Sequence, residues 1–298
     1  MNPILEFSEI RRSFKAGVPV LDGVTFSMQP GEVVGLLGRN GAGKTTLIHI
    51  AMGLLTPDSG QTRVFGISPL EDPVAIKLRI GFVSEEQVFP AWSKVGDLIA
   101  FHKYLFKRWD DGLERQLMER FAVPASSRIG KLSKGQARQV ALLCAVCHRP
   151  ELLLLDEPAG GLDPVARREF LETAIQLLNR EGTAILFSSH QMADVERIGG
   201  RVVLLDGGRV WIDRDLNRIR EEISVAMIPR ASAPDAAAIE RIPGCLRVRA
   251  VYDDWHAVVE GQPEVVSARV AQALGADGVR CVQVPLEELF IELVGGER

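Results

Sequence analysis

Residues Gly38 to Thr45 read G-R-N-G-A-G-K-T and match the phosphate-binding pattern G-x-x-x-x-G-K-[ST]. An apolar run, 33–37, leads into them, and a segment with helical spacing, 46–55, follows them. A glycine-rich turn between a strand and a helix turns backbone N–H groups toward an anion, and the dipole at the helix N-terminus favours negative charge. We therefore predict an α/β fold built on a parallel core sheet that binds a nucleoside triphosphate.

Each position of this loop has an expected role. Lys44 would reach the β- and γ-phosphates, and the Thr45 hydroxyl would bind Mg²⁺. The other predicted contacts with the nucleotide come from Gly38, Asn40, Gly41, Gly43 and Thr46. The alternative is a glycine turn without a ligand, and the flanking strand and helix argue against it.

A second motif places two carboxylates beside the same phosphates. The run L-L-L-L at 152–155 is followed by Asp156 and Glu157. Such a run predicts a central parallel strand, and ligands bind at the carboxyl ends of such strands. Asp156 is therefore expected at the Mg²⁺, and Glu157 beside the γ-phosphate, where a carboxylate can polarise the attacking water. A strand that simply ends in two solvated acids is the alternative.

A third motif, L-S-K-G-Q at 132–136, precedes a helical pattern at 137–148. Ser133 and the first N–H groups of that helix form a second predicted anion site. One chain has a single phosphate cradle, so a second site far from it indicates a nucleotide shared between two chains. As chemistry alone, the motif is equally well explained as a helix N-cap and nothing more.

Charge and hydropathy narrow the class of protein. The formal net charge is −4, so the chain lacks the excess of basic residues that is typical of nucleic-acid-binding proteins. No apolar run approaches the roughly 18 residues that a membrane-spanning helix needs, and the N-terminus lacks a secretory signal pattern. The string C-x-x-C-H at 144–148 matches a haem-attachment motif, but it continues an apolar helical pattern and no export signal accompanies it. Cys144 and Cys147 are therefore predicted to act as small buried hydrophobic residues.

Over residues 4–212 the chain resembles the nucleotide-binding subunit of an ABC transporter. The resemblance is carried, in the family's order, by the loop at 38–45, L-S-K-G-Q at 132–136, Asp156-Glu157, G-L-D at 161–163, and His190 after the apolar run 184–189. It implies a head-to-tail dimer of two copies around two ATP molecules. Ser133, Gly135 and Gln136 of each copy would then face the γ-phosphate held by the other.

The resemblance also assigns residues outside these motifs. Phe14 stands where the family stacks an aromatic ring on adenine, and a ring face suits a flat base. His190 would contact the γ-phosphate and the attacking water. Glu85 stands where the family commonly has Gln; a carboxylate can accept a bond from Mg²⁺ or its water, so Glu85 is a candidate metal ligand, with Gln87 as its substitute. Lys134 replaces the usual Gly and either adds a contact across the dimer or is solvated.

Two domains are predicted. Residues 1–214 form the ATP-binding cassette, in which a parallel core sheet is joined by an antiparallel β subdomain and a helical subdomain at about 85–150. Residues 215–298 follow the pattern β-α-β-β-α-β, which indicates a small α+β domain of ferredoxin-like order. We recognise no catalytic or ligand-binding motif in the sequence of this second domain. A dimer-stabilising or regulatory role and a simple packing appendage are equally good explanations of it.

The main hypothesis is an ATPase that powers a membrane exporter of the drug- and antibiotic-export type. Glu157, His190 and Lys44 would be its catalytic residues, with ATP and Mg²⁺ as cofactors. A separate transmembrane permease would receive the motion, so the chain would be cytoplasmic and peripheral on the inner face of the cell membrane. The apolar residues Phe89 and Trp92 lie where the family's permease docks, and core packing explains them equally well.

Two other classes remain as alternatives. One is a soluble ABC-type ATPase that acts on ribosomes or DNA. The single cassette and the short segment between Lys44 and Ser133 argue against it, since such relatives carry two cassettes or long insertions. The other is a nucleotide-binding regulator without turnover, and the intact pair Asp156-Glu157 argues against that.

Overall fold

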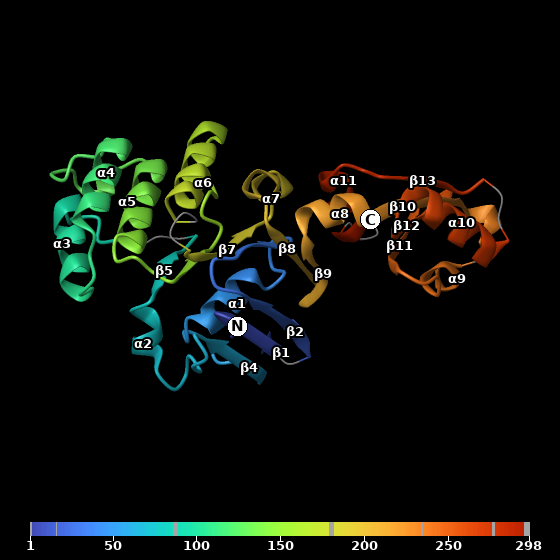
Figure 1. Ribbon diagram of the computed structural model, residues 1–298, viewed down its shortest axis with the longest axis horizontal. Helices are drawn as coiled ribbons and strands as arrows, with labels where there is room; N and C mark the ends of the chain where they lie inside the picture. Colours follow the sequence, from blue (N-terminus) through green and yellow to red (C-terminus); the bar gives the residue numbers. More distant parts are fainter. Residues whose placement is uncertain are drawn as a thin grey trace. The chain divides into compact units, whose positions relative to one another are not determined.

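The computed structural model describes residues 2–15, 17–85, 89–178, 182–233, 235–275 and 278–294, so the candidate Gln87 lies outside the described residues. The chain forms two compact units, residues 1–212 and 213–298 (Figure 1). The division falls close to the boundary at 214/215 that the sequence predicts. Each unit has its own hydrophobic core.

The first unit is built on a six-stranded sheet in the order β5-β6-β7-β3-β8-β9. Its strands are β3 (Val33–Leu37), β5 (Ile80–Val83), β6 (Leu152–Leu155), β7 (Ala184–Ser189), β8 (Arg201–Asp206) and β9 (Arg209–Asp215). β3 runs parallel to β7 and β8, and β6 runs parallel to β5 and β7. All four residues of β6 are buried, which confirms the prediction of a central strand at 152–155.

A second, antiparallel sheet of this unit has the order β2-β1-β4. Its strands are β1 (Leu5–Lys15), β2 (Val18–Met28) and β4 (Ser59–Val64). The sequence predicts an antiparallel β subdomain in the cassette, and its strands β1 and β2 have 11 residues each. Register shifts along the β1–β2 pair interrupt the simple alternation that marks a long strand. Phe7 and Phe26 meet across the pair, with ring centroids 5.0 Å apart, and join the main core.

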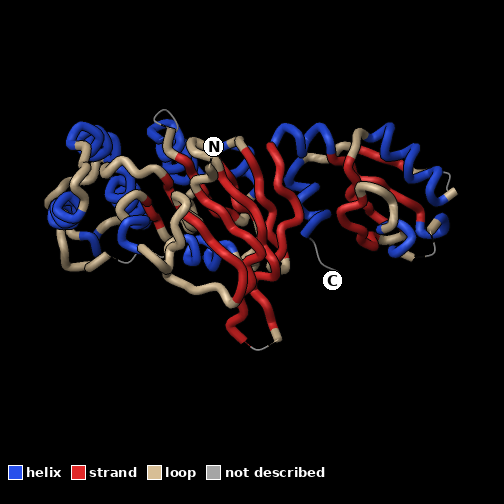
Figure 2. The backbone as a smooth tube through the Cα atoms, turned by 60° about the horizontal axis from the view of Figure 1, so that its bottom comes forward, coloured by secondary structure: helices blue, strands red, loops and turns tan. Residues whose placement is uncertain are grey.

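The helices of the first unit are α1 (Lys44–Ala51), α2 (Pro73–Lys77), α3 (Val95–Leu105), α4 (Asp111–Phe121), η1 (Ile129–Lys131), α5 (Lys134–Val146), α6 (Pro164–Leu178) and α7 (Met192–Ile198). Figures 1 and 2 show α3, α4 and α5 grouped beyond the β5 edge of the sheet. Within this helical subdomain, a break at 106–110 separates α3 from α4. The break occurs because the Asp110 side chain accepts from Leu113 N at 2.8 Å and so starts α4.

The second unit contains α8 (Leu216–Glu222), β10 (Ile223–Pro229), η3 (Arg230–Ser232), α9 (Ala236–Glu240), β11 (Cys245–Val251), β12 (Asp254–Glu260), α10 (Pro263–Leu274), β13 (Arg280–Val282) and α11 (Leu286–Val294). Its antiparallel sheet has the order β11-β12-β10-β13. From β10 to β13 the elements follow the order β-α-β-β-α-β of the split βαβ motif. Ile239 of α9 and Val266 and Val270 of α10 pack on one face of this sheet.

The structure also bears on the thiols and the surface. Cys144 and Cys147 are almost fully buried and unpaired, and burial raises the pKa of the Cys147 thiol to about 12. Both therefore behave as small apolar residues, as predicted.

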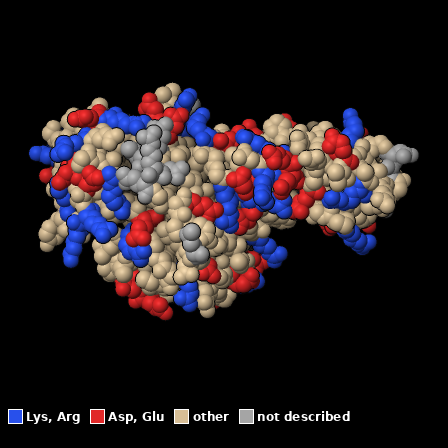
Figure 3. All heavy atoms as spheres, viewed as in Figure 1, with Lys and Arg blue, Asp and Glu red and all other residues tan. Residues whose placement is uncertain are grey.

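Within the described ranges, every helix falls short of the length and apolar character that crossing a bilayer requires. Basic and acidic side chains are interspersed over the face drawn in Figure 3.

Candidate functional site

The loop between β3 and α1 has the backbone shape of an anion cradle. Gly41 and Gly43 adopt positive φ angles of 84° and 105°. A Cβ at Gly43 would lie 2.5 Å from Leu21 Cδ2, so both conformation and space require glycine there. Gly43 is also the N-cap of α1, and among the described residues no side-chain hydrogen bond caps this helix start. The first N–H groups of α1 are thus available to phosphate oxygens.

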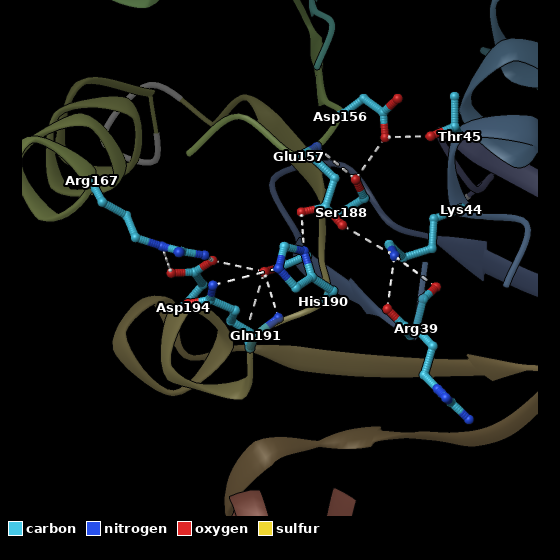
Figure 4. A network of polar contacts seen from close by, with 12 residues as sticks. Arg39, Lys44, Thr45, Asp156, Glu157, Arg167, Ser188, His190, Gln191 and Asp194 are labelled. Atoms are coloured by element: carbon cyan, nitrogen blue, oxygen red, sulfur yellow. Dashed lines mark hydrogen bonds and ion pairs between the residues drawn. The ribbon is translucent and has the colours of Figure 1, made fainter. Parts of the chain in front are cut away.

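Lys44, the first residue of α1, brings a buried positive charge to the mouth of this loop. Its Nζ donates to the carbonyl oxygens of Gly38 at 2.7 Å and of Arg39 at 3.2 Å. The same Nζ lies 3.1 Å from Glu157 Oε1, and both side chains are less than a tenth exposed (Figure 4). The paired carboxylate compensates the cost of burying the ammonium group. The structure therefore joins the phosphate loop directly to the carboxylate after β6.

Asp156 and Thr45 meet as the sequence predicts. The Thr45 hydroxyl donates to Asp156 Oδ1 at 3.1 Å, and the Ser188 hydroxyl at the end of β7 donates to the same oxygen at 2.7 Å (Figure 4). Asp156 is 1% exposed. Strands β6 and β7 thus place one buried carboxylate at the N-terminus of α1, where phosphates would bind.

The oxygen atoms of Thr45 and Asp156 suit Mg²⁺. A hydroxyl and a carboxylate are hard ligands, and Mg²⁺ in phosphate sites takes most of its other ligands from water and the phosphates. Within the described ranges, no group of three or more His, Cys, Asp or Glu side chains could hold a metal by itself. The donor set of Thr45 and Asp156 therefore fits a Mg²⁺ that binds together with a nucleotide.

Glu157 is held in a constrained backbone conformation that aims its side chain. Its φ is 43°, in the left-handed region that non-glycine residues seldom adopt. Its N–H donates to Ser188 Oγ at 2.8 Å, while its Oε2 lies 2.8 Å from His190 Nδ1. Because a carboxylate only accepts hydrogen bonds, His190 carries a proton on Nδ1. One carboxylate thus contacts Lys44 through one oxygen and His190 through the other.

Comparisons with known proteins agree with this arrangement. The family model described as "ABC transporter" matches residues 21–160. Nod factor export ATP-binding protein I of Burkholderia thailandensis is 32% identical over 98% of this chain and 97% of that protein. The chain belongs to the ABC transporter ATP-binding proteins. The ABC transporter ATP-binding protein YtrB of Bacillus subtilis is 29% identical over 97% of this chain and 99% of its own length.

Solved structures show the same cassette fold. A structure of the ATP-binding subunit of an ABC transporter is 29% identical, covers 73% of this chain and 92% of its own, and has a TM-score of 0.66. A dimeric ATP-binding cassette bound to ADP and Pi, 21% identical, covers 71% of this chain and 98% of its own with a TM-score of 0.62. This ABC protein is therefore an ATPase with the P-loop cassette fold.

The signature motif of this ABC protein lies on the helical subdomain. Ser133 is the N-cap of α5 and is exposed; its Oγ accepts from Gln136 N at 3.1 Å, while Ser133 N donates to Gln136 Oε1 at 3.0 Å. The Gln136 side chain is thus used within its own helix. Within the described ranges, the Ser133 hydroxyl accepts this bond and donates to no acceptor, so its proton is available to a ligand. Among the described residues, neither Ser133 nor Gln136 is hydrogen-bonded to the phosphate loop.

Two candidates with weaker signals stand apart from this network. Phe14 is 57% exposed at the end of β1, and the Arg12 guanidinium lies 5.1 Å from its ring centroid. Glu85 follows β5 and is exposed. In the described part of the chain, its side chain makes no hydrogen bond to Thr45 or Asp156. The role of Glu85 as a metal ligand therefore stays a prediction.

Sequence reasoning missed two residues that organise the site. Ser188 bonds to both Asp156 and the backbone of Glu157; a serine at the carboxyl end of an otherwise apolar strand is the signal that identifies it. Arg138 of α5 is 8% exposed and donates to the carbonyl oxygens of Ser84, at 2.6 Å, and of Glu85. Arg138 thereby ties the signature helix to the loop after β5. No local pattern marks that contact.

Proposed function

We propose that two copies of this chain close around two MgATP molecules and drive a separate transmembrane permease of an export system. The proposal of export draws support from the relatives named Nod factor export ATP-binding protein I, whose alignment runs through both units of this chain. The chain would then be peripheral on the inner face of the cell membrane. The cassette, residues 1–214 in the sequence prediction, would supply the ATPase.

The observation that carries this proposal is the placement of Glu157 between Lys44 and His190. On ATP binding, Lys44 would exchange its contact with Glu157 for the β- and γ-phosphates, which leaves the carboxylate to accept a proton from the attacking water. His190 would hold the other carboxylate oxygen and thereby orient the base. Mg²⁺ held by Thr45 and Asp156 would neutralise charge on the phosphates.

The second copy would complete each site through the signature motif. Ser133 has a hydroxyl proton available and sits at the N-terminus of α5, where N–H groups and the helix dipole favour an anion. Gly135 leaves close approach open, because a Cβ there would meet no atom nearer than 3.8 Å. The γ-phosphate would therefore lie between the phosphate loop of one copy and Ser133 of the other. Adenine would stack on Phe14.

The permease would dock on the exposed aromatic side chains of the helical subdomain. Trp92 is 79% exposed and Phe101 of α3 is 58% exposed, which disfavours core packing as the explanation of Trp92. The rings of Phe89 and Phe101 both contact His102, with centroids 6.3 Å and 5.9 Å away. An apolar surface of this kind suits a short helix of a membrane protein.

Glu157→Gln tests the chemical assignment. The variant should bind ATP with near-normal affinity, while turnover falls by about 10²–10⁴-fold, as for loss of a general base. Glu151→Gln is the matched control, because Glu151 is exposed and pairs with Arg79 away from the site. Turnover by the Glu157 variant equal to that of the control would remove the basis of the proposal.

Mixed dimers and co-purification test the partners. Lys44→Ala and Ser133→Arg should each abolish hydrolysis alone, while their mixture should regain activity, because one composite site then keeps both functional residues. A mixture that stays inactive would exclude the shared site. A tagged chain recovered from detergent-solubilised membranes should bring down an integral membrane protein. Recovery of ribosomes or DNA without one would instead support a soluble ATPase.

A further inference from the structure

A buried ion pair lies behind His190, on the side away from the phosphate loop. Arg167 of α6 donates through Nε to Asp194 Oδ1 at 2.7 Å, and a second N–H donates to Asp194 Oδ2 (Figure 4). The Arg167 side chain is 13% exposed and that of Asp194 is 5% exposed. This two-point contact has a defined orientation, so it sets the position of α7 against α6 as well as neutralising the charge.

Asp194 in turn holds the chain on both sides of His190. The Ser189 hydroxyl donates to Asp194 Oδ2 at 2.7 Å, and Gln191 N donates to Ser189 Oγ at 3.0 Å. The His190 side chain is 38% exposed, so surrounding packing does not fix it. The hydrogen bonds of its two neighbours therefore set where the imidazole stands relative to Glu157.

The other end of this connection begins at the G-L-D motif at 161–163. Arg167 N donates to Asp163 O at 2.9 Å, and Asp163 Oδ1 accepts from Val165 N and Ala166 N, both at 3.0 Å. The first turn of α6 is thus fixed to Asp163. A continuous set of hydrogen bonds runs from the 161–163 loop through Arg167 and Asp194 to the backbone at His190.

We infer that Arg167 is a positioning residue that, through Asp194 and Ser189, holds His190 in contact with Glu157 for hydrolysis. The inference rests on the catalytic roles proposed for Glu157 and His190 and extends them to a residue without contact to the nucleotide. It also implies that a movement of the 161–163 loop would shift α6 and, through Arg167 and Asp194, change the position of His190.

Arg167→Ala should therefore lower kcat selectively. A misplacement of about 1 Å can cost about 10²-fold in rate, so we expect a decrease of roughly 10- to 100-fold, with the KM for ATP unchanged within about threefold. Arg167→Lys keeps the charge but loses the two-point geometry, and should recover part of the rate. Arg168→Ala is the matched control, because the adjacent Arg168 is 63% exposed and pairs along its own helix with Glu172.

The decisive measurement compares Arg167→Ala in the wild-type and His190→Ala backgrounds. Residues that act as a unit are strongly non-additive, so Arg167→Ala should cause no further loss once His190 is absent. An equal loss of kcat in both backgrounds would show a general structural role and overturn the inference. If Arg167→Ala fails to fold, Arg167→Met with Asp194→Leu removes the pair without leaving a buried unpaired charge, and the same comparison applies.

The outcomes separate this inference from the proposed function. A wild-type chain that does not hydrolyse ATP, or a Glu157→Gln variant with full turnover, would defeat the proposed chemistry itself. Normal, Glu157-dependent turnover with an Arg167→Ala rate equal to that of the Arg168→Ala control would defeat only the positioning role. A rate unaffected by His190→Ala would do the same, since there would be no histidine function to support.

Discussion

Ser188→Ala removes one hydroxyl that contacts two residues of the candidate site, Asp156 and Glu157. Ser188 is 0% exposed, donates to Asp156 at 2.7 Å and accepts from Glu157 N at 2.8 Å. A hydrogen bond to a charged group contributes about 1.5–3 kcal/mol, and a buried donor left unpaired costs about 1–3 kcal/mol. Because the two effects share one small site, they will not add fully, and we expect the unfolding free energy to fall by about 2–4 kcal/mol.

The loss can be measured by scanning calorimetry. For a unit of about 200 residues, this change corresponds to a decrease in Tm of about 5–15 °C. The cassette unfolds in the transition whose Tm rises when MgATP is added. Turnover should fall as well, because the left-handed backbone at Glu157 loses the hydrogen bond that holds it.

Thr183→Val is the matched control. Thr183 is buried in the same unit, and its hydroxyl donates to a single neutral acceptor, Pro150 O, at 2.9 Å. The near-isosteric change should cost about 1 kcal/mol and leave turnover unaffected. If Ser188→Ala were no more destabilising than Thr183→Val, or if it left turnover intact, the argument that Ser188 organises the two carboxylates would be wrong.

Three further results are expected. Gly43→Ala should abolish ATP binding in a calorimetric titration, because the φ of Gly43 is 105° and a Cβ there would collide with Leu21. A variant that binds ATP normally would contradict the geometry described for the phosphate loop. The Leu113 N–H, and after it the Arg149 guanidinium, hold the pKa of Asp110 below its ordinary value. The stabilisation that ionised Asp110 gives the folded protein is therefore present above about pH 4 and is lost as the pH falls through the lowered pKa. Asp110→Ala should accordingly cost about 1 kcal/mol at pH 7 in urea unfolding, and the difference from wild type should shrink toward pH 3, not grow. In native protein at pH 8, a thiol reagent should react with Cys245 and Cys281 before Cys144 and Cys147. The reason is that burial raises the pKa of Cys147 to about 12 and that of the half-buried Cys245 to about 11. Equal rates for all four thiols would refute the burial of Cys144 and Cys147.

Much of the fold could be read from local patterns. The limits of α7, α10 and α11 agree with the helical spacing at 192–198, 263–274 and 286–294, because each has a clear cap or apolar stripe. The break between α3 and α4 was not predicted. The length of β1 and β2 was not predicted either, since bulges in their register obscure the alternation that marks a strand.

The sequence by itself determined which residues are candidates for the site. Lys44, Thr45, Asp156 and Glu157 each follow or begin an element with a clear apolar pattern, and parallel strands bring their carboxyl ends to one edge. His190 was assigned through the resemblance to the ABC family. Those residues could therefore be assigned before any contact was known.

Only the tertiary structure decided how these residues are held. Ser188 reaches the Asp156 carboxylate and the backbone N–H of Glu157 because β7 lies beside β6. Arg167 reaches Asp194 because α6 packs against α7. Such contacts join segments far apart in sequence through single side chains, and no residue pattern records which one a packed neighbour will meet.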